Sequence, residues 1–281
     1  GKNVQPFLGD GLGGSSQFFG MVMERLDSPD FISNGGAWPG LEKEWETDFA
    51  ISEKLYQVTS GRNLEAFGAV HDRLQKAGFR IRETKLACRQ VSGCQFCQGR
   101  NCPKACKVDA SQGPLQKAHA SGNLFVLNAR VSGFVLQGDR VIEAKCDGPM
   151  GQGKVRAQNF VLAAGALRTP GILKNSENSI QAEDFTRLPA IGHYFMRHLV
   201  DLYALDWPAL RELSKDQISE LARAKSWSSE TFYSGDGKKL GLIQAFGSLP
   251  DFRFVWREVL QMWPALQWIQ IGRASCRERV Y

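Results

Sequence analysis

The chain has 281 residues, of which 43% are hydrophobic and 23% are charged. This composition is typical of a globular protein and excludes a disordered, collagen-like or disulfide-dependent miniature protein. The formal net charge is +6, without a long basic run, so nucleic-acid binding is not expected. No uncharged apolar stretch reaches the ~18 residues of a membrane span, and no transmembrane span is predicted. No signal peptide is recognisable, so the compartment stays open between cytoplasm and periplasm.

The first half of the chain begins with a glycine-rich loop at residues 9–16. Residues 17–26 lack proline and carry regularly spaced apolar side chains, which predicts a helix directly after the loop. Residues 28–48 are rich in glycine, proline and aromatic residues, and we expect a surface excursion. A helical apolar stripe follows at 64–77 and ends at a glycine, after which 79–82 predict a short strand.

The second half has a mainly β pattern after a short helix predicted at 115–120. Short apolar runs predict strands at 124–127, 133–136, 141–145 and 160–164. The first three suggest a small meander. The run at 160–164 has no polar alternation, so we expect a strand buried on both faces, leading through a glycine into a helix at 167–174. Aromatic residues between 252 and 268 suggest an amphipathic helix.

The loop matches the pattern G-x-G-x-x-G at residues 9–14. A dinucleotide fingerprint also needs a strand before the loop and an acidic residue at the end of a second strand. Only residues 4–8 precede the loop, and Pro6 interrupts them, so we reject a first-strand Rossmann fingerprint. The four glycines still allow a ligand to approach the backbone, and amide groups with two serine hydroxyls suit a phosphate. A tight turn without a ligand is the alternative.

Three segments together resemble the glucose-methanol-choline (GMC) family of flavin oxidoreductases. They are the loop followed by Gly20 and Met21, the segment FVLAAGALRTPGIL at 160–173, and the shorter IGHYFMRH at 191–198. The resemblance covers roughly residues 7–205. It identifies the chain as a central fragment of such an enzyme. Residues 271–281 resemble a translated sequencing-adapter tail, and we exclude them from the fold.

The resemblance implies FAD as the cofactor and names the residues that would lie against it. These are Gly11, Gly13, Gly14, Ser15, Ser16, Gly20, Met21, Val131 near the adenine, and Ala164 with Gly165 at the end of the buried strand. Phe19 stands where the family often has asparagine near the flavin ring. The family's catalytic histidine is expected in a C-terminal segment that this chain lacks, so no catalytic residue is assigned.

The resemblance also implies the fold class and the domains. We expect an α/β fold with mixed α+β character, in which a partial Rossmann-like FAD-binding domain with a β-meander joins part of a substrate-binding domain. The expected division is FAD-binding at 1–34, a cap excursion at 35–107, FAD-binding again at 108–180, substrate-binding at 181–270, and the tail at 271–281.

Cysteines crowd one segment in the spacing Cys94-x2-Cys97-x4-Cys102-x3-Cys106, with Cys88 just before it. Four thiols within so short a stretch can converge on a metal or an iron-sulfur cluster if the backbone turns tightly. The stretch 97–106 is similar to the iron-sulfur motif of some bacterial membrane-linked GMC sugar dehydrogenases. Disulfides, unmodified thiols and a structural zinc site are the alternatives.

The expected function is therefore oxidation of a CH–OH group of an alcohol or sugar to a carbonyl, by hydride transfer to flavin, although the fragment alone is expected to be inactive. The partners implied are a small-molecule alcohol or sugar and an electron-acceptor protein or quinone. Two alternatives remain open: an FAD-containing lyase of the hydroxynitrile type, and an iron-sulfur or metal-binding electron-transfer module with a vestigial flavin site.

Overall fold

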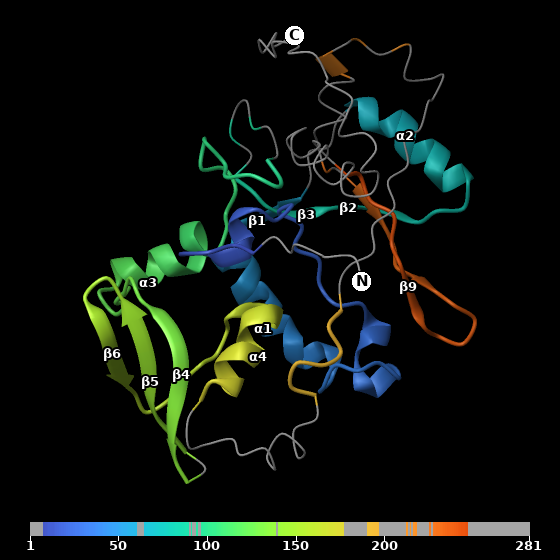
Figure 1. The fold of residues 1–281 in the computed structure, drawn as a ribbon. Helices are drawn as coiled ribbons and strands as arrows, with labels where there is room; N and C mark the ends of the chain where they lie inside the picture. The colour runs from blue at the N-terminus through green and yellow to red at the C-terminus, as the bar shows by residue number, and fades with distance from the viewer. Residues whose placement is uncertain are drawn as a thin grey trace, which may run out of the picture. The chain divides into compact units, whose positions relative to one another are not determined.

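The computed structural model describes residues 8–60, 65–89, 91, 94, 97–138, 140–176, 190–196, 212, 214, 216–217, 225 and 227–246 (Figure 1). The chain divides into two compact units, residues 1–124 with 204–281 and residues 125–203. Each unit is considered by itself. The segments expected at 252–268 and 271–281 lie outside the described residues.

The segment after the glycine-rich loop is extended, so the helix predicted at 17–26 is wrong. A short 3-10 turn, Gly14–Gln17, forms the end of the loop and is not continued as a helix. Residue Met21 has a φ of 67°, which a right-handed helix does not accommodate. Its carbonyl accepts a hydrogen bond from Ala87 N (2.8 Å), and Met23 N donates to Lys85 O (2.9 Å). Pairing with a distant strand therefore overrides the local helical pattern.

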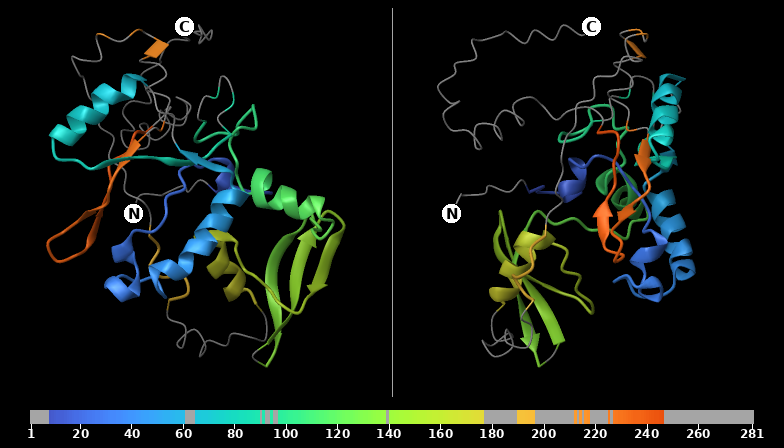
Figure 2. Two further views of the ribbon diagram at one scale, coloured as in Figure 1. Left: turned by 180° about the vertical axis from the view of Figure 1, so that it is seen from behind. Right: turned by 90° about the vertical axis from the view of Figure 1, so that its right-hand side faces the viewer.

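Among the described residues of the first unit, the strands form two antiparallel pairs and one hairpin. Strand β1 (Val58–Ser60) pairs with β3 (Lys85–Ala87), and β2 (Ile81–Glu83) pairs with β7 (Trp227–Ser229). The strand predicted at 79–82 is thus present, although it begins two residues later. Two further strands, β8 (Phe232–Tyr233) and β9 (Lys239–Gly241), form a hairpin that extends outward in the left view of Figure 2.

The part of this unit that the structure describes contains three α-helices. Helix α2 (Glu65–Lys76) confirms the prediction at 64–77 and ends before Gly78, which has a φ of 89°. A single π-helical turn, Ser111–Leu115, runs into α3 (Gln116–Ala120), which confirms the prediction at 115–120.

Helix α1 (Glu42–Leu55) begins inside the stretch predicted to be a surface excursion. Its first residues follow a leucine rather than a capping serine or aspartate. The cap comes instead from Glu44, whose carboxylate accepts a hydrogen bond from Leu41 N at 2.8 Å. Because no serine, threonine, aspartate or asparagine marks the start of this helix, the sequence analysis did not predict it.

The second unit contains an antiparallel meander of three strands, which Figure 1 shows side by side. They are β4 (Arg130–Gln137), β5 (Arg140–Gly148) and β6 (Gly151–Arg156). The strands predicted at 133–136 and 141–145 are confirmed. The prediction at 124–127 is wrong, because those residues form no strand, and the sequence analysis did not predict β6. Every residue of β6 is exposed, so it lacks the apolar pattern that marks a buried strand.

Helix α4 (Gly165–Lys174) confirms the helix predicted at 167–174, but the buried strand predicted before it is wrong. Residues 160–164 form no strand, and Val161 is 90% exposed. An apolar run is buried as a strand only where neighbouring strands pair with it, and no described strand does so. The hydroxyl of Ser176, just after α4, accepts a hydrogen bond from Phe134 N (3.0 Å) and donates to Ile172 O (2.9 Å). This serine joins the helix to strand β4.

The fold is a mixture of helices and small sheets, which confirms the α/β class in its general form. All strand pairs within the described residues are antiparallel, and the Rossmann-like arrangement and the division into domains stay predictions. No helix in the described part of the chain is long and apolar enough to cross a membrane.

Candidate functional site

The glycine-rich loop has the backbone conformation of a ligand-binding turn. Gly11, Gly13 and Gly14 have φ values of 91°, 81° and 50°, which side chains rarely adopt. Nothing lies within 4 Å of a Cβ placed on Gly11 or Gly14, so the space above these residues is open. A Cβ on Gly13 would lie 3.3 Å from Ser111 N. The loop therefore offers open backbone on one side while packing closely on the other, which fits a cofactor that contains phosphate.

The two serines of the loop have different contacts. Ser16 Oγ donates to Gly13 O (2.5 Å) and accepts from Ala110 N (3.0 Å), so this hydroxyl ties the loop to the start of the helical segment 111–120. Ser15 Oγ accepts a hydrogen bond from Gly9 N at 3.2 Å. Because a hydroxyl carries one proton and two lone pairs, Ser15 can still donate to a phosphate oxygen.

Gly20 and Met21 have different surroundings from those of the loop. A Cβ on Gly20 would lie 2.3 Å from Lys225 Nζ and 3.1 Å from Gln98 Oε1, so an added side chain would have to displace the end of Lys225. The side chain of Met21 is 1% exposed and belongs to the hydrophobic core with Leu86. Met21 can therefore reach a ligand only through its backbone.

Two buried lysines lie beside the segment that follows the loop. Lys107 is 1% exposed, and its Nζ donates to Gln17 O (2.8 Å) and Arg100 O (2.9 Å) and lies 5.9 Å from the ring centroid of Phe19. Burial lowers its pKa. Lys225 is 4% exposed, and burial followed by repulsion from Lys107 lowers its pKa to about 8. The two cations create a positive environment that favours an anionic or electron-rich ligand.

The sequence analysis missed both lysines. Neither belongs to a motif, and Lys225 approaches Gly20 from a position about 200 residues away along the chain. Only the tertiary structure brings these residues together.

The other predicted cofactor residues lie in the second unit. Val131 is in strand β4, opposite Cys146 of β5. Ala164 is the residue before α4, and Gly165 begins that helix with a φ of 83° and open space around its Cβ position. The predicted FAD residues thus belong to two units. In the second unit they lie in strand β4 and at the turn that begins α4. The segment 191–196 is described, whereas 197 and 198 of the third motif are outside the described residues.

The cysteines of this segment make close sulfur contacts, and the Cys94 thiol neighbours Cys106 as well as Cys88. Cys102 Sγ lies 3.1 Å from Cys106 Sγ, and Cys88 Sγ lies 3.6 Å from Cys94 Sγ. Cys97 is buried near Lys107. All described cysteines are free thiols. The sequence spacing singled out Cys97 as the partner of the other three, whereas the structure places Cys88 against Cys94.

The thiols of the closest pair differ in acidity. Although burial raises the pKa of Cys102, backbone N–H groups of Lys107, Lys104 and Cys106 and the thiol of Cys106 lower it to about 7. Burial and the neighbouring thiols of Cys102 and Cys94 raise the pKa of Cys106.

Within the described part of the chain, no group of three or more His, Cys, Asp or Glu side chains is arranged to hold a metal ion. The iron-sulfur and zinc interpretations of the cysteine segment therefore gain no support from the structure. The pairwise contacts agree with the thiol and disulfide alternatives.

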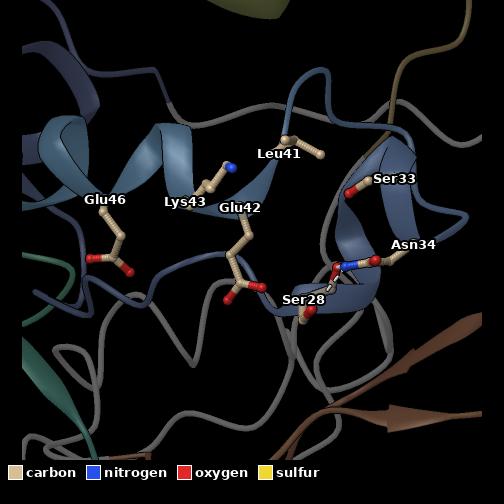
Figure 3. Close-up of a pocket in the computed structure, with 7 residues that line it drawn as sticks. All are labelled: Ser28, Ser33, Asn34, Leu41, Glu42, Lys43 and Glu46. Carbon is tan, nitrogen blue, oxygen red and sulfur yellow. Dashed lines mark hydrogen bonds between the residues drawn. The ribbon is translucent and has the colours of Figure 1, made fainter.

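Two pockets within the described residues lie away from the predicted cofactor residues. One, of about 560 Å³, lies between two 3-10 turns and the first turn of α1, where Asn34 Nδ2 donates to Ser28 Oγ at 2.9 Å (Figure 3). The other, of about 370 Å³, surrounds Arg25, whose guanidinium pairs with Glu53 at 2.7 Å. Both are open, and most of the residues that line them are charged or polar, so neither replaces the glycine-rich loop as the candidate site.

Comparison with known protein families places the chain in a class of FAD-dependent oxidoreductases. A family model described as "GMC oxidoreductase" matches residues 7–200. Since this match covers more than half of the 281 residues, the chain belongs to the GMC oxidoreductase family. No curated protein matches the chain. The family resemblance inferred from the three motifs is confirmed.

Proposed function

We propose that this protein oxidises the CH–OH group of an alcohol or sugar to a carbonyl, with FAD as the hydride acceptor. The observation that carries the proposal is the family match over residues 7–200, which includes the glycine-rich loop and the turn at Ala164 and Gly165. Bound FAD supplies an electron sink for the hydride that leaves the alcohol carbon.

In this proposal the loop of the first unit holds the phosphate-containing part of the cofactor. Gly11 and Gly14 let the backbone approach it because no atom lies within 4 Å of their Cβ positions. Gly13 keeps the loop packed on the helical segment, and Ser16 ties the loop to Ala110. Ser15 donates its hydroxyl proton to a phosphate oxygen.

The segment after the loop supplies the electrostatic environment. Lys225 lies against Gly20, and Lys107 lies over the ring of Phe19. Two buried cations stabilise a neighbouring group that gains negative charge, because few water molecules screen them there. Met21 contributes backbone groups only, since its side chain is in the core.

The family resemblance also implies cofactor contacts for Val131, through its backbone, and for the turn at Ala164 and Gly165, which belong to the second unit. Gly165 combines a φ of 83° with open space, the same combination seen at Gly11. We assign no residue to the removal of the hydroxyl proton. The electron acceptor is proposed to be a protein or a quinone.

The experiment is anaerobic reduction of the FAD-loaded protein by a panel of alcohols and sugars. Bleaching of the visible band of oxidised flavin by one of them supports the proposal. A substrate deuterated at the alcohol carbon should then react more slowly, because the C–H bond breaks in the step. Cleavage of cyanohydrins, with no bleaching by any alcohol or sugar, would instead support the lyase alternative.

A further inference from the structure

Cys102 and Cys106 face each other across one tight turn of the chain. Their sulfur atoms are 3.1 Å apart, and Ala105 N donates to Cys102 O at 3.2 Å to close the turn. Ala105 has a φ of 50°, a conformation that is uncommon for alanine. The strained turn therefore holds the two thiols together without a bond between them.

The two thiols differ in access. Cys106 is 2% exposed and packs with Met21, Leu86 and Cys88, whereas Cys102 is partly exposed. Backbone N–H groups of Lys104 and Lys107 donate toward the Cys102 sulfur and would stabilise a thiolate there. An accessible nucleophilic sulfur beside a buried one is the arrangement needed for thiol–disulfide exchange.

We propose that Cys102 and Cys106 form a reversible dithiol–disulfide pair that reacts with disulfide compounds, with Cys102 as the attacking and Cys106 as the resolving thiol. The proposal does not depend on the oxidation of alcohols.

The exchange is balanced in atoms and electrons. The Cys102 thiolate attacks one sulfur of a disulfide RSSR, an S–S bond forms to the protein, and RS⁻ leaves. Cys106 then loses its proton to this thiolate and attacks the Cys102 sulfur, releasing the second RS⁻. The protein dithiol loses two electrons, and RSSR gains two electrons and is reduced to two RSH.

The other close pair fits this role less well. Cys88 and Cys94 are 3.6 Å apart, and Cys88 is fully buried in the core. The sulfur atoms of this pair are also farther apart than those of Cys102 and Cys106, which are at 3.1 Å. Cys146 belongs to the second unit and gives a matched control.

Peptide mapping tests the pair on the full chain treated with oxidised glutathione. Trypsin cuts after Lys104, between the two cysteines, so a Cys102–Cys106 disulfide joins the peptides NCPK and ACK. A bond from Cys88 would instead involve LACR, and one from Cys94 or Cys97 would involve QVSGCQFCQGR. We expect the NCPK–ACK pair, reversed by dithiothreitol.

Two variants test the order of the steps. Cys106→Ser should retain one glutathione on Cys102, because the resolving thiol is missing, whereas Cys102→Ser should react at least tenfold more slowly. Cys146→Ser should behave like the unsubstituted chain.

Other results would overturn the proposal. These are oxidation of a different cysteine pair, no disulfide after treatment, or equal glutathione addition in the two variants. Stoichiometric iron or zinc in the purified protein, with the cysteines protected from alkylation, would also overturn it and would support a metal site. The peptide map of the unsubstituted chain shows which cysteines form the disulfide, even if a variant fails to fold.

Discussion

Replacing Lys225 by methionine should stabilise the protein at neutral pH. Lys225 is 4% exposed, and burial followed by repulsion from Lys107 lowers its pKa from 10.5 to about 8. No carboxylate among the described residues raises it again. At pH 7 the chain must therefore bury an ammonium that is more stable in water, and methionine keeps an unbranched side chain of similar length without the charge.

The lowered pKa gives the size of the effect. A fall from 10.5 to about 8 corresponds to about 3 kcal/mol in the free energy of unfolding, since one pKa unit is worth about 1.4 kcal/mol. Between these two values the unfolded chain binds more protons than the folded chain, so the stability of the unsubstituted protein rises with pH. The K225M protein should therefore be more stable by the full ~3 kcal/mol below pH 8, and the two free energies of unfolding should become equal above about pH 10.5.

Urea unfolding of both proteins at pH 7 and at high pH measures this difference. Lys43→Met, at an exposed position of α1, serves as the control and should change stability by less than about 0.5 kcal/mol at both pH values. A K225M protein that is less stable at pH 7, or a difference that does not shrink as pH rises, would refute the burial argument.

Two further substitutions, one of them with a control, test local features of the structure. Gly13→Ala should cost about 1–2 kcal/mol of loop stability, because φ is 81° and Ser111 is close, and should weaken FAD binding about tenfold in a fluorescence titration. Gly171→Ala, where the added methyl meets open space, should leave FAD binding unchanged. Ser176→Ala should cost about 1–3 kcal/mol in urea unfolding, because it leaves the buried Phe134 N without its acceptor, and an unchanged stability would refute the proposed link between α4 and β4.

Local patterns in the sequence were sufficient for the elements whose signals are local. Helix α2 carries its own apolar stripe and a glycine stop, and strands β4 and β5 alternate around a turn. The helix before Gly122 likewise ends where its glycine, with a φ of 73°, permits the chain to turn.

The wrong predictions concern segments whose structure depends on distant partners. Residues 21–23 have a helical composition, but they pair with β3, more than 60 residues further on. The run at 160–164 has the composition of a buried strand, yet no described strand pairs with it. The composition of a segment shows which secondary structures it can adopt. Whether it forms a strand depends on a neighbouring strand that can pair with it.

At the candidate site, too, the sequence predicted local features but not those that depend on long-range contacts. The family motif pointed to the loop, whose glycines have the left-handed conformations that a ligand-binding turn requires. It could not indicate that Lys107 and Lys225 are buried beside that loop's continuation, because their positions depend on tertiary packing. Cysteine spacing alone also could not show that Cys88, rather than Cys97, lies against Cys94.

The central claim is that the glycine-rich loop belongs to an FAD site, and direct titration of the purified chain with FAD tests it best. We predict saturable quenching of flavin fluorescence at one FAD per chain, with about tenfold weaker binding in Gly13→Ala and normal binding in Gly171→Ala. Absence of saturable binding, or equal affinity of the two variants, would contradict this assignment of the cofactor site.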